Sequence, residues 1–151
     1  MEQMKHIFLY VYIATVRESM VKRMSYKLYT TYLSKIKDLP KGIVKAIIMR
    51  MPPMSIKNIE GTVHVPQLSP KTEVLKAYKV NNNFEVFTEK FNEQMYTDPE
   101  TMEYLEMLME ALEYNDVAII CCEKDPNVCH RSLIAKYLTS LGYQYEELQE
   151  A

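Results

Sequence analysis

The clearest pattern of apolar and polar positions lies near the C-terminal end of the chain. A continuous apolar run at residues 117–122 is followed by four polar or turn residues and then by apolar residues at helical spacing. This pattern predicts a buried strand, a tight turn and an amphipathic helix. Asp125 is expected to cap the helix, Pro126 to be its first residue and Gly142 to follow its end. One stripe of the helix carries His130, Ile134, Tyr137, Leu138 and Leu141.

The N-terminal part predicts a strand followed by a helix. Residues 7–15 are β-branched and aromatic, which favours a buried strand with Arg17 just past its end. Ser25 is expected to cap a helix that ends near residues 38–42. Its apolar face would carry Tyr26, Tyr29, Leu33 and Ile36.

A second buried strand is predicted at residues 43–49. It ends at Arg50, because the two prolines at residues 52–53 cannot continue a strand or a helix. Residues 55–69 have no strong periodicity and are expected to form a loop with a short strand at residues 62–65.

Three helices and a short edge strand complete the predicted elements. Ser69 with Pro70 and Asp98 with Pro99 each form a cap-and-proline pair that predicts a helix start. Between these pairs, Phe84, Phe87, Phe91 and Met95 fall on one helical face. Residues 143–148 suit a short edge strand.

The order of elements determines the expected fold class. Strands that alternate with helices imply a mainly parallel sheet covered on both faces. The 151 residues suffice for one domain with a substantial core, and no linker or repeat divides them. We therefore expect a single three-layer, Rossmann-like α/β domain over residues 1–151.

Composition and charge narrow the function classes. A net charge of −2 gives no basic excess and argues against general nucleic-acid binding. The longest apolar run, at residues 7–14, is too short to cross a bilayer, so no membrane association is expected. The three cysteines surround one turn and do not frame a disulfide scaffold, which favours a reducing, cytoplasmic compartment.

Polar residues gather where the last strand passes into its helix. A helix start exposes backbone N–H groups that bind anions, and in open α/β sheets ligands usually lie at the carboxyl edge. Three of the four arginines follow predicted strand ends, and the guanidinium fork suits phosphate or carboxylate. We therefore expect an anion-binding pocket that contains Arg50, Cys122, Glu123, Lys124, Cys129, His130 and Arg131.

Several better-defined sites fit the sequence poorly. The chain has neither G-x-G-x-x-G nor a Walker loop. A Cys-x5-Arg phosphatase loop is disfavoured because Asp125, not cysteine, stands six residues before Arg131. Side chains alternate along a strand, so Cys121 and Cys122 cannot both join Cys129 around one ion, and at most three ligands converge. We expect no metal and no cofactor.

The roles of the individual cysteines and of His130 stay open. Cys122 lies beside a helix start and a lysine, which lower a thiol pKa, but it also ends an apolar strand where cysteine commonly packs. Cys129 is expected to be more exposed. His130 is either a histidine bonded to backbone at the rim of the core or a ligand contact and proton carrier.

Two segments carry a family resemblance. Residues 118–135 read AIICCEKDPNVCHRSLIA, and residues 65–79 read VPQLSPKTEVLKAYK. The first resembles the signature of the DUF488 family, an apolar strand and Cys-x-Glu-Lys followed by Cys-His-Arg at a helix start. The second is similar to a segment of the short, often phage-associated branch of that family. The resemblance implies an α/β domain whose pocket also includes Tyr78 and Lys79, and it implies no particular reaction.

The expected function is the capture of a small anionic, nucleotide-derived ligand. In a phage-encoded protein this would sequester an immune signal in the host cytoplasm. One alternative is an enzyme acting on a nucleotide or nucleic-acid component, with His130 or Glu123 as acid or base and a cysteine as nucleophile. Another is an inhibitor that blocks a host protein. The Phe and Met stripes also suit a homo-oligomer.

Overall fold

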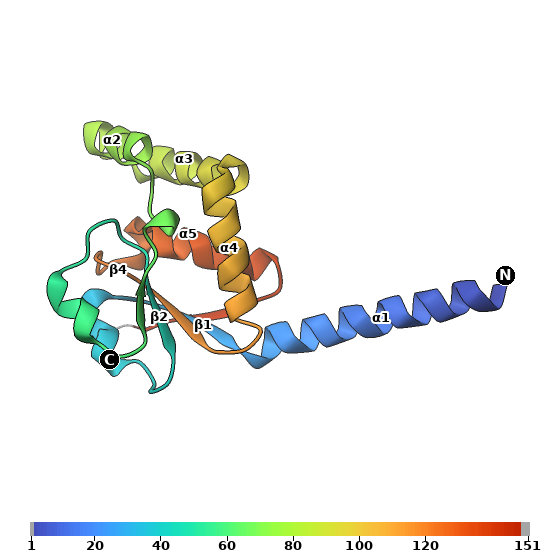
Figure 1. Cartoon of the computed structure of the whole chain (residues 1–151). Coiled ribbons are helices and arrows are strands. Elements are labelled where there is room, and N and C mark those ends of the chain that lie inside the picture. Colours follow the sequence, from blue (N-terminus) through green and yellow to red (C-terminus); the bar gives the residue numbers. More distant parts are fainter. Residues whose placement is uncertain (1, 149–151) are drawn as a thin grey trace.

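A five-stranded, all-parallel sheet forms the centre of the protein (Figure 1). The computed structural model describes the backbone of residues 2–148 and, within that range, the side chains of all residues except 2, 19–25, 57 and 81. The strands are β1 (Lys27–Tyr32), β2 (Val44–Ile47), β3 (Thr62–His64), β4 (Val117–Cys121) and β5 (Gln144–Glu147), in the order β3-β2-β4-β1-β5. The parallel sheet flanked by helices confirms the predicted Rossmann-like α/β class.

The side chains of the central strand β4 pack into two separate core clusters, one on each face of the sheet. Val117, Ile119 and Cys121 belong to the larger core cluster, which includes residues of the α-helices. Ala118 and Ile120 point to the opposite face, into a smaller cluster. Side chains of successive strand residues alternate between faces, so Cys121 faces the α-helices.

Helices of different kinds cover the two faces. The larger cluster is built with α2 (Thr72–Asn81), α3 (Phe84–Thr97), α4 (Pro99–Ala111) and α5 (His130–Ser140). The smaller cluster includes residues of two 3-10 helices, η1 (Leu33–Asp38) and η2 (Met54–Asn58). The carboxyl ends of β2 and β4 lie side by side, because Ile48 N–H donates to the Ile120 carbonyl over 3.0 Å.

Local signals located α3 and α4 correctly. The Asn83 side chain accepts hydrogen bonds from the backbone N–H groups that start α3, and the Asp98 carboxylate accepts from Thr101 N–H at 3.0 Å. Helix α2 begins later than predicted, at Thr72. Ser69 does not cap it, because the buried Ser69 hydroxyl donates to the Pro66 carbonyl. The predicted strands at residues 43–49, 62–65 and 143–148 are confirmed as β2, β3 and β5.

The strand predicted at residues 7–15 is wrong, because this segment lies in α1 (Glu2–Ser25), a helix that projects away from the sheet (Figure 1). Its apolar side chains are exposed, with Phe8 at 70%. The propensity of β-branched residues for strands acts only where a partner strand exists. This segment has no place in the sheet, and a helix satisfies its own backbone groups. Within residues 2–148, no helix combines the length and apolarity needed to cross a membrane.

The helix predicted from Ser25 is also wrong. Residues 27–32 form β1, which pairs with β4 on one side and β5 on the other. Tyr and Thr are strong strand formers, and this segment has two partner strands. The helical spacing of Tyr26, Tyr29, Leu33 and Ile36 therefore did not reflect a helix, and only the short η1 follows the strand.

The turn after β4 differs from the prediction in one respect. The Asp125 carboxylate accepts from Asn127 N–H at 2.9 Å and caps a short 3-10 helix, η4 (Pro126–Val128). Helix α5 then starts separately at His130, with Cys129 in extended conformation before it. Gly142 follows the helix with φ +97°, as predicted. The break places Cys129 and His130 side by side at the sheet edge.

Candidate functional site

A cavity of about 240 Å³ lies at the carboxyl edge of the sheet, where β2 and β4 end and α5 begins. The loop after β2 contributes Arg50, and the end of β4 contributes Cys121. The start of α5 contributes Cys129 and His130 to the same cavity. The position is the one expected for a ligand site in an open α/β sheet.

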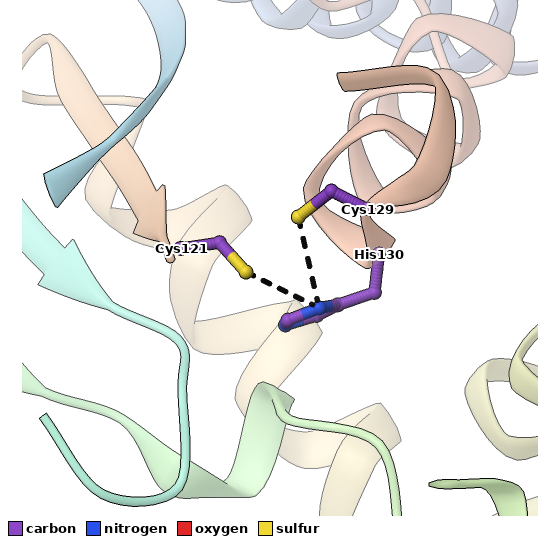
Figure 2. Close-up of side chains that lie close together, drawn as sticks. All are labelled: Cys121, Cys129 and His130. Atoms are coloured by element: carbon purple, nitrogen blue, oxygen red, sulfur yellow. Dashed lines mark hydrogen bonds between the residues drawn. The ribbon is translucent and has the colours of Figure 1, made fainter. Parts of the chain in front are cut away.

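Two cysteines and a histidine meet on one wall of this cavity (Figure 2). His130 Nδ1 lies 3.6 Å from Cys121 Sγ and 4.0 Å from Cys129 Sγ. All three side chains are buried. The expectation that Cys129 is more exposed than Cys122 is therefore wrong, because Cys122 is the exposed cysteine. Figure 2 shows the two sulfur atoms approaching the same ring nitrogen, one from the end of β4 and one from the start of α5. We call these three residues the Cys–His cluster.

The orientation of the His130 ring follows from its other nitrogen. Nε2 lies 2.8 Å from the Ile48 carbonyl oxygen. A carbonyl only accepts hydrogen bonds, so Nε2 carries the proton and donates it. In the neutral imidazole, Nδ1 is then unprotonated and presents its lone pair to the sulfurs. The Phe91 ring packs edge-on against the imidazole at 5.5 Å and helps to hold it in place.

Arg131 does not line the cavity, contrary to the expectation from the sequence. Its side chain is fully buried, and Nε donates to the Glu147 carboxylate at 2.7 Å. The Nη1 and Nη2 groups donate to the carbonyls of Glu123 and Lys124. The guanidinium therefore ties α5 to β5 and to the turn after β4. A group held on three sides inside the protein is not available to a phosphate.

The thiol of Cys129 has a lowered pKa. A hydrogen bond from the Cys121 thiol is the main cause, and the Arg131 backbone N–H and positive charge act in the same direction against the effect of burial. The end of β4, through Cys121, and the start of α5, through Arg131, therefore both stabilise the Cys129 thiolate. In contrast, the hydrogen bond with Cys121 and partial burial raise the pKa of Cys122. Cys122 stays protonated at neutral pH, which disfavours it as a nucleophile.

Aromatic side chains form another part of the cavity lining. Tyr78 of α2 packs edge-on against Phe87 of α3 with ring centroids 5.5 Å apart, and Phe84 stacks on Phe87 at 5.1 Å. The sequence predicted Tyr78 as a pocket residue but assigned both phenylalanines to the core. Their period revealed the helix, but nothing in the sequence showed that the helix borders a cavity.

The remaining predicted site residues divide into two groups. Arg50, Cys122 and Glu123 line the cavity and are exposed. Lys79 and Lys124 are exposed and do not line it. Cys121 was missed, because β4 is buried on both faces and its apolar pattern does not tell which cysteine faces α5.

Comparison with known proteins identifies the family. The family model described as "Active DUF488-N3 subclade" matches residues 28–142. This span is more than half of the chain and contains every residue of the Cys–His cluster, while α1 lies outside it. No curated protein and no solved structure matches the chain. The chain belongs to the DUF488 family.

Proposed function

We propose that the cavity captures a small anionic, nucleotide-derived ligand. The observation that carries this proposal is the pairing of an aromatic wall with an arginine at the rim of one cavity, at the carboxyl edge of a parallel sheet. Nucleotides join a planar base to an anionic group and therefore match both features. The same sheet edge holds the ligand in many open α/β proteins.

The aromatic wall supports binding of a planar ring. Tyr78, Phe84 and Phe87 form a continuous set of ring contacts on this side of the cavity. Aromatic side chains bury large apolar areas and favour stacked or edge-on contacts with other rings. A base packed against these rings would be removed from water on the contacting face.

Arg50 is the cationic group at the rim. Its Nη1 donates to Thr72 Oγ1 at 3.1 Å and its Nη2 to the Pro70 carbonyl at 3.0 Å. These bonds use two of the five guanidinium N–H groups and fix the plane of the group. The other N–H groups can donate to a phosphate or carboxylate. Arg50 is exposed, so binding an anion there does not require burial of an isolated charge.

The size of the cavity limits the ligand. Its volume of about 240 Å³ is below the range of about 300–1,000 Å³ that is common for drug-sized ligands. We therefore propose that one base or nucleoside enters, while the phosphates stay at the rim near Arg50. A cyclic dinucleotide would be held by one half only.

Calorimetric titration of the full chain in buffer that contains a metal chelator tests this proposal. The panel consists of mononucleotides, ADP-ribose and cyclic dinucleotides. We expect at least one compound to bind, and Arg50→Gln to weaken it about tenfold, which corresponds to about 1.4 kcal/mol and is typical of a hydrogen bond to a charged group. Lys79→Gln removes the same charge outside the cavity and serves as the matched control. Indifference of the folded chain to the whole panel, or equal losses in both variants, would contradict the proposal.

An enzyme acting on a nucleotide or nucleic-acid component is the second candidate. It is favoured by the position of Cys129, whose Sγ lies 4.0 Å from Nδ1 of His130, and by the lowered pKa of its thiol, because a thiolate beside a base can act as a nucleophile. Incubation of the panel with the protein, followed by chromatography, tests this function. We expect Cys129→Ser to abolish turnover while binding survives and Cys122→Ser to leave both unchanged. Recovery of every bound compound intact would exclude turnover of the panel.

The proposed capture of a nucleotide would have a specific effect if the protein is encoded by a phage. In a phage-encoded protein, capture of a nucleotide would remove a host immune signal from the host cytoplasm.

Self-association also stays a prediction, although the Phe stripe cannot provide the interface because Phe87 and Phe91 are buried. Light scattering of the full chain measures its mass in solution. A monomer at all concentrations would contradict the prediction of self-association.

A further inference from the structure

The Cys–His cluster has a feature that ligand capture does not use. A nucleophilic thiol needs one partner base. Here, two buried sulfurs, Cys121 Sγ and Cys129 Sγ, converge on the same unprotonated nitrogen of His130 (Figure 2). All three potential ligand atoms lie within 4.8 Å of one another. Thiolate and imidazole are the preferred ligands of zinc and related divalent metals.

The distances between these atoms fit a tetrahedral metal site. With Zn–S bonds of about 2.3 Å and Zn–N bonds of about 2.0 Å, tetrahedral geometry places sulfur and nitrogen about 3.5 Å apart. The observed separations from His130 Nδ1 are 3.6 Å to Cys121 Sγ and 4.0 Å to Cys129 Sγ. The three atoms already lie within 4.8 Å of one another, so small side-chain rotations would bring all of them to bonding distance from one ion.

The surroundings of His130 are those of a metal ligand. A histidine that binds a metal through one ring nitrogen usually donates the other N–H to a carbonyl or carboxylate. His130 Nε2 makes such a bond to the Ile48 carbonyl at 2.8 Å. The ring is thus oriented before any ion arrives, with the lone pair of Nδ1 directed toward the two cysteines.

Charge and access also favour an ion at this position. Two thiolates and one neutral imidazole around a divalent cation have no net charge, which suits a buried cluster. All three residues line the cavity, so an ion held by them would be accessible from the space proposed for the ligand. Three protein ligands with one open position are the usual arrangement of a catalytic zinc site.

We propose that Cys121, Cys129 and His130 bind a divalent transition metal ion of the zinc type and leave its fourth coordination position open to the cavity. The sequence predicted no metal because only three ligands can converge, and three are sufficient when the fourth position is left open. The ion would make Cys129 a ligand in place of a nucleophile. It would also supply the cavity with a Lewis acid able to polarise an oxygen of a bound compound.

Cobalt titration of the untagged full chain under a phosphine reductant tests the site. Cobalt(II) reports on its own coordination, because thiolate ligands give intense charge-transfer absorption and tetrahedral geometry strengthens the visible bands. We expect saturation at one equivalent, displacement of cobalt by zinc, and one zinc per chain after dialysis against zinc followed by buffer. This measurement needs no variant and therefore does not depend on the folding of a mutant.

Single substitutions then locate the ion. We expect Cys121→Ser, Cys129→Ser and His130→Gln each to lower zinc affinity at least tenfold. Cys122→Ser is the matched control, because Cys122 is the neighbouring cysteine, lines the same cavity and is exposed. Cys122→Ser should keep the thiolate charge-transfer band and the binding of one cobalt per chain.

Two results would overturn the metal proposal. One is a folded, reduced chain that shows no charge-transfer band and retains no zinc. The other is loss of the spectrum in Cys122→Ser to the same extent as in Cys129→Ser. Neither result would contradict the capture of a nucleotide-derived ligand. The calorimetric titration that tests capture is done in chelator, and its outcome depends on Arg50.

Discussion

The Nε2–H of His130 donates to the carbonyl oxygen of Ile48 over 2.8 Å, across 82 positions of the sequence. The bond joins the first residue of α5 to the residue that follows β2. It determines which ring nitrogen faces Cys121 and Cys129. The chemistry of the cavity wall therefore depends on the parallel sheet, which brings the ends of β2 and β4 together.

The tautomer of His130 is directly measurable. We expect the metal-free protein at neutral pH to contain the Nε2–H tautomer of His130, because a carbonyl accepts and never donates. Nitrogen-15 NMR of the side chain distinguishes the two tautomers by the coupling of each ring proton. A proton on Nδ1 would contradict the arrangement described for the Cys–His cluster.

Removal of the His130 ring should destabilise the fold. His130→Ala leaves the buried Ile48 carbonyl without its partner, which costs about 1–3 kcal/mol of unfolding free energy. Urea denaturation measures this change. His64→Ala is the matched control, because His64 bonds the Met49 carbonyl at 2.8 Å in an exposed position where water can replace it. Equal losses in the two variants would show that burial of the Ile48 bond is unimportant.

Arg131 should act on stability, with no direct contact to a ligand. Arg131→Ala leaves the Glu147 carboxylate unpaired in a partly buried position, and breaking a buried ion pair costs about 3–5 kcal/mol. Arg50→Gln, at an exposed arginine, should change unfolding free energy by less than about 0.5 kcal/mol. If Arg131→Ala lost ligand binding but kept normal stability, the result would contradict this structural role. Arg131 would then be a residue that binds the anion.

Asp98 should stabilise α4 in a pH-dependent way. The Lys71 ammonium is the main cause of its lowered pKa, and the Thr101 backbone N–H contributes further. Loss of such a cap in Asp98→Ala costs about 1 kcal/mol at neutral pH. The stabilisation is complete above the unfolded-state pKa of about 3.9 and is lost as pH falls through the lower folded-state value.

Denaturant titrations at neutral and acidic pH check this prediction. The difference between Asp98→Ala and the unmodified chain should shrink as the solution becomes acidic. Asp125→Ala provides a comparison, because Asp125 caps only the three-residue η4. A difference that stays constant down to the lowest pH would exclude the carboxylate as its cause.

Sequence reasoning worked where the signals were local. The spacing of Phe84, Phe87 and Phe91, and the Asp98–Pro99 pair, define α3 and α4 without help from the rest of the chain. It failed at residues 7–15 and 26–36, where strand and helix patterns compete. There the outcome depends on which segment finds partner strands, and only the assembled sheet decides this.

For the site residues too, local sequence signals gave correct predictions and long-range contacts could not be predicted. Cys129 and His130 follow β4 so closely in sequence that any strand-turn-helix places them at the sheet edge. The position of Arg131 could not be predicted, because its partner Glu147 lies in β5, sixteen residues further along the chain. Cys121 was missed because the pattern of β4 does not reveal which face α5 covers.

The most direct test of the proposed capture is NMR mapping of the binding position on the full chain. ADP-ribose and a mononucleotide are added in turn to the isotope-labelled protein in chelator. We expect the signals of Tyr78, Phe87 and Cys121 to shift and saturate with the added compound, and Arg50→Gln to reduce these shifts while Lys79→Gln does not. Saturating shifts confined to residues outside the cavity, or no shifts with either compound, would contradict nucleotide capture at the carboxyl edge of the sheet.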